Sequence, residues 1–329
     1  MARKASLLDL IHPRMILVIS LFANAMFFAA AAMSAETLRV AKSVPQAFSF
    51  VPLDVGIQNG IFKKNGLDID AAAFSGDAKM QQAMAADSID VGIGSGPAMA
   101  FIVKGAPIKG VAAMAGRPLL LTLVARSDGS IKSVADVKGK RVGVSTVGSL
   151  TYWVADELSR QKGWGPGGIE IAPVGAFKPM LAALKTKQID AMVTDVATAY
   201  ELEKSGAGKV VFRFGDLVKD FHIHVIFATN KIIASRPKAL RAFLKGWFET
   251  ITFMRKNKTN TVQIAKEIME TDAGIAGRVY DELMPMFSDD GKFDSKALAV
   301  LSRSYVELKV LDKEPDMTKL YTEAFLPKK

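Results

Sequence analysis

Small and polar residues gather at five places where an apolar run ends and a helical stretch begins. Small residues let a ligand approach the backbone, and the first turn of a helix leaves N–H groups unpaired and carries partial positive charge. A carboxylate, sulfonate or phosphate group would suit such a place. The candidate ligand-binding residues at and beside these five places are Ser43, Gln46, Phe48, Gly76, Ser95, Gly96, Ser145, Thr146, Ser149 and Asp195.

A helix cap is the alternative for every hydroxyl and carboxylate in this set, because Ser, Thr and Asp are the usual N-cap residues. Capping is favoured for Asp77. Ligand contact is favoured for the hydroxyl-rich stretch 145–149 and for Gly94-Ser95-Gly96-Pro97, where the glycines indicate a tight backbone path. Asp195 stays open: its carboxylate either receives an amine or ring N–H of the ligand or caps its own helix.

Catalytic and metal chemistry have little support in the sequence. It has no cysteine, which removes thiolate metal sites and cysteine nucleophiles, and we find no convincing catalytic triad. His222 and His224 would share one face of a strand, but they lack a clear carboxylate companion, so a hinge position is preferred to a metal site. We therefore expect no enzyme activity, no metal and no cofactor.

The candidate residues need a parallel sheet to bring them together. Apolar runs predict strands at 38–41, 67–74, 89–93, 108–113, 141–145, 169–174 and 189–194. Helical spacing predicts helices at 51–65 with a break at Gly60, and at 77–86, 96–103, 150–162, 178–185 and 196–204. This alternation is typical of an α/β fold with mainly parallel sheets flanked by helices, and ligands bind at the carboxyl ends of such strands.

The two halves of this pattern resemble each other, which indicates an internal repeat of two α/β units. Arg39-Val40 recurs as Arg141-Val142. Four further residues recur 100 positions on: Met80, Ala83, Ile89 and Asp90 as Met180, Ala183, Ile189 and Asp190.

Long apolar runs at 119–125 and 224–228 bracket the second unit. We interpret them as two crossover strands that form a hinge between two lobes. Lobe one would then comprise 36–125 and 228–329, and lobe two 126–227. Beyond the second run we expect helices at 237–257, 259–270, 274–284 and 295–308, with a final helix within 315–329.

The N-terminus predicts export. Arg3, Lys4 and Arg14 precede or flank an apolar stretch that ends in small residues, the pattern of a secretory signal peptide over residues 1–35. Cleavage after Ala32 or Ala35 is expected, with an uncleaved anchor helix as the alternative. The mature protein would be periplasmic and monomeric. The net charge of the full sequence is +10, and its Lys and Arg are dispersed without a basic run, so no nucleic-acid partner is expected.

Several segments together resemble the periplasmic binding proteins of nitrate, sulfonate and taurine ABC importers, which share a fold with thiamine-pyrimidine-precursor binding proteins. The segments are 51–69, 89–94, 138–144, 189–191 and 287–291. The resemblance implies a two-lobed type II periplasmic binding fold, an ABC permease as partner and no catalysis. It also implies ligand contacts at Ser43, Gly76, Ser95, Ser145, Thr146 and Asp195.

Ligand identity does not carry over from this resemblance. Many relatives have an aromatic-proline pair near the start of the second lobe's last helix, where this chain has Thr194-Asp195-Val196-Ala197. Helix N-termini and the basic balance favour a small organic anion of the sulfonate, nitrate or aromatic acid type. A thiamine pyrimidine precursor is the alternative. A pyrimidine-synthase-like enzyme is less favoured, since the cysteine-rich motif of that enzyme is absent.

Overall fold

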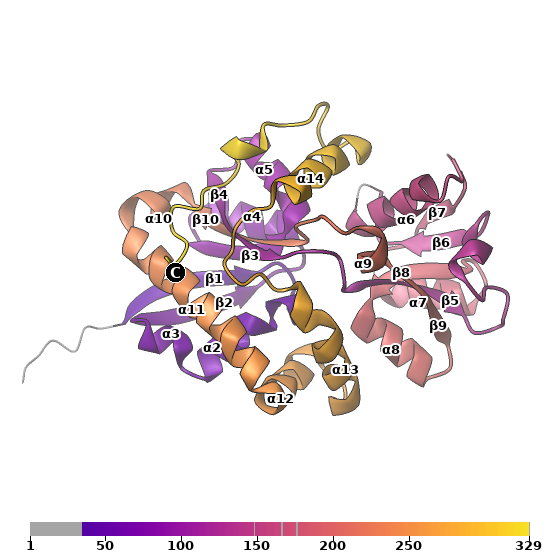
Figure 1. The fold of residues 1–329 in the computed structure, drawn as a ribbon, viewed down its shortest axis with the longest axis horizontal. Helices are drawn as coiled ribbons and strands as arrows, with labels where there is room; N and C mark the ends of the chain where they lie inside the picture. The colour runs from indigo at the N-terminus through magenta and orange to yellow at the C-terminus, as the bar shows by residue number, and fades with distance from the viewer. Residues whose placement is uncertain (1–34, 148, 166, 176, 329) are drawn as a thin grey trace, which may run out of the picture. The chain divides into compact units, whose positions relative to one another are not determined.

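The computed structural model describes residues 35–147, 149–165, 167–175 and 177–328. The signal peptide predicted over residues 1–35 therefore lies outside the described residues, apart from Ala35, and so does Gly148 in the hydroxyl-rich stretch. From Glu36 onward the chain forms a unit built on two five-stranded sheets (Figure 1).

The two sheets have the same strand order. The first runs β2-β1-β3-β10-β4 and the second β7-β6-β8-β5-β9. In each, the first three strands pair in parallel, while the fourth, β10 or β5, is antiparallel to both neighbours. This confirms the predicted α/β class and gives the internal repeat a structural counterpart. The strands are β1 Glu36–Lys42, β2 Leu67–Ala73, β3 Val91–Ser95, β4 Ile108–Ala115, β5 Leu121–Arg126, β6 Arg141–Val144, β7 Glu170–Pro173, β8 Ala191–Asp195, β9 Gly208–Arg213 and β10 His224–Thr229.

The two apolar strands expected to cross between the lobes do not themselves cross. Strand β5 lies wholly in the second sheet and β10 wholly in the first. Each is the antiparallel fourth strand, covered on both edges and buried, so its long apolar run reflects burial within a sheet. Segments 116–120 and 218–223 connect the sheets instead. Below, lobe one means residues 36–115 and 224–328, and lobe two means residues 121–217.

Helices flank both sheets at nearly all the predicted places. Gly60 separates α2 from α3 with a φ of 66°, as the break in the pattern indicated. Helix α11 begins with proline in its first turn and buries an apolar stripe that includes Leu240, Leu244 and Trp247. The helices are α2 Val51–Gln58, α3 Ile61–Lys64, α4 Asp77–Ala85, α5 Ala100–Val103, α6 Leu150–Gln161, α7 Phe177–Lys185, α8 Val196–Lys204, α9 Phe214–Leu217, α10 Asn230–Ser235, α11 Pro237–Lys256, α12 Lys258–Met269, α13 Ala273–Leu283 and α14 Ser295–Glu307. Short 3₁₀ helices are η2 Phe48–Phe50, η3 Gly96–Met99, η4 Val134–Val137, η5 Met284–Met286 and η6 Met317–Lys319.

Four elements depart from the sequence expectation. Strand β9 and the short helices α9 and α10 were not predicted, and the final helix predicted within 315–329 is wrong. The tail instead runs along β4, where the Gly110 N–H donates to the Leu320 carbonyl at 3.0 Å and the Thr322 N–H to the Gly110 carbonyl at 2.9 Å. These bonds pair polar groups at a sheet edge that helix formation would leave open.

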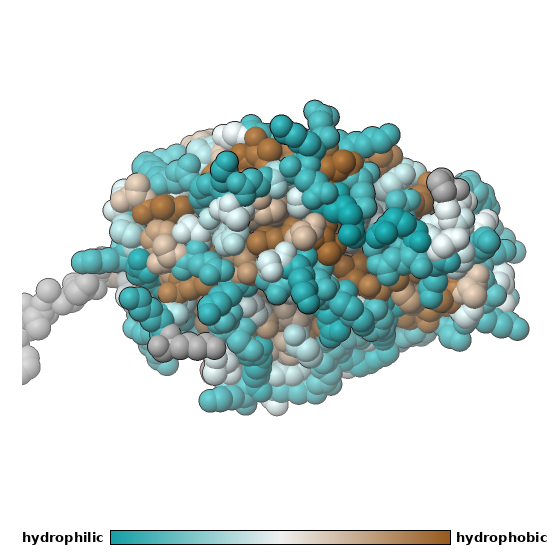
Figure 2. Space-filling view, turned by 45° about the horizontal axis from the view of Figure 1, so that its top comes forward, coloured by the Kyte–Doolittle hydropathy of each residue, from teal (hydrophilic) through white to brown (hydrophobic). Residues whose placement is uncertain are grey.

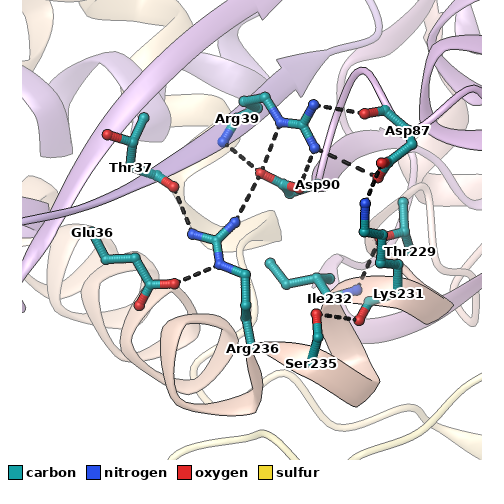
Figure 3. A network of polar contacts seen from close by, with 10 residues as sticks. All are labelled: Glu36, Thr37, Arg39, Asp87, Asp90, Thr229, Lys231, Ile232, Ser235 and Arg236. Carbon is teal, nitrogen blue, oxygen red and sulfur yellow. Dashed lines mark hydrogen bonds and ion pairs between the residues drawn. The ribbon is translucent and has the colours of Figure 1, made fainter.

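An aspartate between two arginines joins the strands of the first sheet at their amino-terminal side (Figure 3). The Asp90 side chain is 7% exposed. Arg39 Nη2 donates to Asp90 Oδ1 at 2.6 Å, and Arg236 Nη1 lies 3.4 Å from Oδ2. Burial raises the pKa of the Asp90 carboxyl. The hydrogen bonds and charge of Arg39, with the charge of Arg236, outweigh burial and hold that pKa below its usual value.

The same arrangement recurs in lobe two. The Arg141 N–H donates to Asp190 Oδ2 at 3.0 Å, as the Arg39 N–H does to Asp90. Arg126, at the end of the antiparallel strand β5, donates to Asp190 Oδ1 at 3.5 Å. Each lobe therefore ties its first parallel strand to the loop before its third through one clamped carboxylate. We call these two groups the Arg–Asp clamps.

In the part of the chain that the structure describes, no helix is both long and apolar enough to cross a membrane. Figure 2 shows hydrophilic side chains over most of the face in view, with apolar residues in separate patches.

We predict that Asp90→Ala lowers the free energy of unfolding by about 3 kcal/mol, because it leaves two arginines without their shared buried partner. Urea unfolding followed by circular dichroism measures this. Asp281→Ala is the control: it removes an exposed ion pair with Lys258 and should cost under about 1 kcal/mol. Equal losses in the two variants would show that the clamp contributes no more than a surface pair.

Candidate ligand-binding site

A cavity of about 520 Å³ lies between the two lobes. Its volume is typical of sites for small molecules. Lobe one supplies the loop after β1 and the ends of α12 and α13, lobe two supplies the N-terminus of α8, and Leu120 comes from the first connecting segment. The lining residues are Val44, Pro45, Gln46, Ala47, Phe48, Ser49, Leu120, Asp195, Val196, Ala197, Thr198, Glu201, Met269, Glu270, Val279 and Leu283.

Three of the predicted site residues line this interlobe cavity: Gln46, Phe48 and Asp195. Phe48 is 4% exposed and meets the Tyr280 ring edge-on at a centroid distance of 6.4 Å, so packing holds its ring in place. Asp195 Oδ1 accepts a hydrogen bond from the Thr198 N–H at 3.0 Å. Asp195 therefore both caps α8 and lines the cavity, so the capping role does not exclude contact with a ligand.

Ser43, Gly76 and Ser95 surround a carboxyl group of the protein itself. The Ser95 N–H donates to Asp77 Oδ1 at 2.9 Å and the Ser95 hydroxyl donates to Oδ2 at 2.8 Å. Burial raises the pKa of Asp77, while hydrogen bonds from Ser95 and Ser43 lower it. Gly76 begins α4 with a φ of 124°. The donors expected to hold a ligand anion in lobe one are thus engaged by Asp77.

The hydroxyl groups of Ser145 and Ser149 likewise bond within the protein. Ser149 caps α6 by accepting from the Tyr152 N–H at 3.2 Å. The Ser145 N–H donates to Thr151 Oγ1 at 3.0 Å. Thr146 is exposed, and its carbonyl accepts from the Ser149 hydroxyl at 2.8 Å. None of these three predicted residues is among the residues that line the interlobe cavity.

Gly96 contacts the second connecting segment. Its N–H donates to the Ile223 carbonyl at 2.9 Å and its carbonyl accepts from the Tyr305 hydroxyl at 3.2 Å. A Cβ atom built on Gly96 would lie 1.8 Å from the His222 carbonyl oxygen. The glycine expected to admit a ligand thus admits the backbone of segment 218–223.

The two histidines lie at this connection and face different neighbours. His222 Nε2 accepts from the Asp294 N–H at 2.9 Å, whereas the His224 ring meets Phe50 at 4.9 Å. Burial lowers the pKa of both rings, that of His224 to about 3. Within the described ranges, no three His, Cys, Asp or Glu side chains gather where they could hold a metal ion.

Contacts between the lobes flank the cavity. Lys204 on α8 lies 2.7 Å from Asp272, which caps α13, and the Arg278 guanidinium lies 3.6 Å from the Tyr200 ring centroid. Elsewhere the Trp153 indole N–H donates to Glu307 at 2.7 Å. Trp153 is therefore a buried interlobe contact, a role its sequence position did not reveal. The lining residues of α12 and α13 were also missed, because their spacing is that of an ordinary core stripe.

The comparisons with known proteins agree with one another. The model of a family described as NMT1/THI5 like matches residues 47–260. A protein of Brucella abortus named as a binding protein is 26% identical over 231 residues, covering 66% of this chain and 67% of its own. A Haemophilus influenzae protein named for thiamine biosynthesis is 28% identical over 141 residues, covering 42% of this chain and 43% of its own.

Solved structures share the fold. The aliphatic sulphonate binding protein SsuA of Escherichia coli has a TM-score of 0.72 at 17% identity, covering 87% of this chain and 92% of that one. The desulfurization enzyme DszB has a TM-score of 0.65 at 15% identity, with 88% and 97% coverage. At identities this low, the structural similarity shows only that the chain has the two-lobed fold of periplasmic binding proteins. Both binding proteins and an enzyme have this fold.

Gly96→Ala should destabilise the protein by more than about 2 kcal/mol, since the added methyl group collides with the backbone of segment 218–223. Gly277→Ala is a matched control within helix α13, where the added methyl group meets open space. That change should be neutral or stabilising by about 0.5–1 kcal/mol. Urea midpoints of the two variants decide the matter, and a neutral Gly96→Ala would refute the close contact.

Stability should fall as the pH drops below about 6.5. In the unfolded chain His224 takes up a proton near its ordinary pKa, whereas in the folded protein burial keeps the ring neutral down to about pH 3. The unfolded state therefore binds more protons in this window, and acid favours it. Between pH 7 and pH 5 we expect His224 alone to account for about 2 kcal/mol.

Urea titrations of the wild type and His224→Gln at both pH values measure the difference. The variant should lose distinctly less stability on acidification, and His222→Gln should retain the part due to His224. Identical losses in wild type and His224→Gln would contradict the role assigned to this ring.

Proposed function

Because this chain belongs to the NMT1/THI5-like family, we propose that it is the extracytoplasmic solute-binding component of an ABC importer. The observation that carries the proposal is the interlobe cavity, to which both lobes and a connecting segment contribute walls. A ligand bound there touches both lobes, so binding energy can bring them together around it. The names of the Brucella relative and of the sulphonate binding protein support a binding role.

The remaining parts of the proposal follow from this role. The partner is a membrane permease that receives the ligand from the two-lobed protein. The signal peptide delivers the chain to the periplasm, where it acts as a monomer. It performs no catalysis. The desulfurization enzyme among the structural neighbours shares only the fold, and in the described part of the chain no hydrogen bond joins the Ser49 hydroxyl of the cavity to a carboxylate that could act as its base.

The ligand is a small molecule, and two chemical classes are candidates for it. A sulfonate, nitrate or aromatic acid was expected from the donors at the strand ends, yet in lobe one Asp77 engages those donors. A thiamine pyrimidine precursor is the second candidate. The name of the Haemophilus relative favours it, and the ring of Phe48 beside the carboxylate of Asp195 suits an aminated aromatic ring.

A thermal-shift screen against sulfonates, nitrate, aromatic acids, aromatic amines and pyrimidines tests the binding role, since a ligand that binds only the folded state raises the melting temperature. For the strongest hit, Asp195→Ala should weaken binding more than tenfold in calorimetry, about 1.4 kcal/mol. Ser145→Ala lies outside the cavity and should bind like the wild type. The reverse pattern would move the site to the 145–149 stretch.

A further inference from the structure

The charged side chains among the described residues that line the interlobe cavity are all acidic: Asp195, Glu201 and Glu270. Glu201 and Glu270 are exposed, and Asp195 lies further in, partly buried. Three carboxylates around one small cavity create a negative potential at its mouth, which attracts cations and repels anions. The net positive charge of the whole chain therefore does not describe the site.

The basic residues nearest to these carboxylates are committed to other acids. Lys204 lies one helical turn from Glu201 on α8, but its ammonium group pairs with Asp272 at 2.7 Å. Arg278 on α13 lies 3.3 Å from Glu203. Glu201 itself accepts a hydrogen bond from the neutral Thr271 hydroxyl at 3.1 Å. The negative charge at the cavity is thus only weakly balanced from within the protein.

The hydrogen-bond donors and helix N-terminus that would favour an anion already have partners within the protein. The positive end of α8 points toward the cavity, but Asp195 caps it with a carboxylate. The comparable donors in lobe one bond to Asp77. An incoming sulfonate or carboxylate would have to compete with these internal groups and also meet the charge of the three acidic side chains.

A buried hydroxyl group independently indicates a ligand. Ser49 is 1% exposed and lines the cavity, and its Oγ has no hydrogen-bond partner among the residues that the structure describes. A buried hydroxyl without a partner is costly, and a polar group of a bound molecule would satisfy it. Next to it, Phe48, Leu120 and Leu283 provide apolar walls for a ring or short hydrocarbon.

We propose that the interlobe cavity binds an organic cation, a molecule with a protonated amine or a positively charged ring nitrogen attached to a small apolar body. Asp195 receives the cationic group, the Ser49 hydroxyl receives a second polar group, and the apolar walls hold the body. This rests on the proposed binding function and reverses the charge expected for the ligand from the sequence.

Equilibrium dialysis against isosteric pairs tests the charge preference. The probes are benzylamine with benzoate, phenethylamine with phenylacetate, and 4-aminomethylpyridine with isonicotinate. At 20 mM NaCl the wild type should retain the amine at least tenfold better than the acid in at least one pair. Raising NaCl to 500 mM should shrink the ratio, because the exposed Glu201 and Glu270 are screened.

Two variants connect the preference to the cavity. Asp195→Asn keeps the helix cap, since Asn caps as well as Asp, but removes the charge, so the ratio should fall at least threefold. Glu170→Gln removes an exposed acid on β7, outside the cavity, and should leave the ratio unchanged. An equal effect of the two variants, or better retention of the acids, would overturn the proposal and leave the binding function intact.

If the protein retains no probe, it is incubated with yeast extract, washed and denatured, and the released compounds are identified by mass spectrometry. A released cation whose capture is lost in Asp195→Asn supports the proposal. A released anion or neutral compound overturns it. Release of no compound contradicts the proposed binding function itself.

Discussion

The two Arg–Asp clamps fix the strands whose carboxyl ends carry the residues of the candidate site. Each ties the first parallel strand of a sheet to the loop before the third, at the amino-terminal side of the strands. With that side fixed, the carboxyl ends of β1 and β8 present the loop 44–49 and Asp195 to the same cavity. The clamped carboxylates Asp90 and Asp190 are 100 residues apart in the sequence, so the same Arg–Asp contact recurs in both lobes.

The second connection between the lobes is closely packed. Segment 218–223 lies against Gly96 so closely that a methyl group there would meet its backbone. The Trp153 and Phe221 rings stack at 5.2 Å beside it, so the second connection is packed on both lobes. Closely packed connections restrict the relative motion of two lobes to a few backbone dihedrals.

Sequence periodicity was sufficient for the alternation of strands and helices, because burial imposes that pattern directly, and recurring residues indicated the repeat. It misplaced the crossings, since an apolar run cannot distinguish a strand covered within a sheet from one that spans two sheets. Three of its candidates, Gln46, Phe48 and Asp195, line the cavity, yet it could not show that Ser43 and Ser95 face Asp77. A sequence does not distinguish a hydroxyl group that donates to a ligand from one that donates to a neighbouring carboxylate.

The insertion of β10 between β3 and β4 has a consequence for how the protein matures. Lobe two is one continuous stretch of chain, so its sheet can form from nearby partners. The first sheet lacks its fourth strand until more than one hundred further residues have emerged, and β4 would meanwhile present an unpaired edge. Pairings of such long sequence separation form slowly, so lobe one should be the last part of the newly made chain to become resistant to protease.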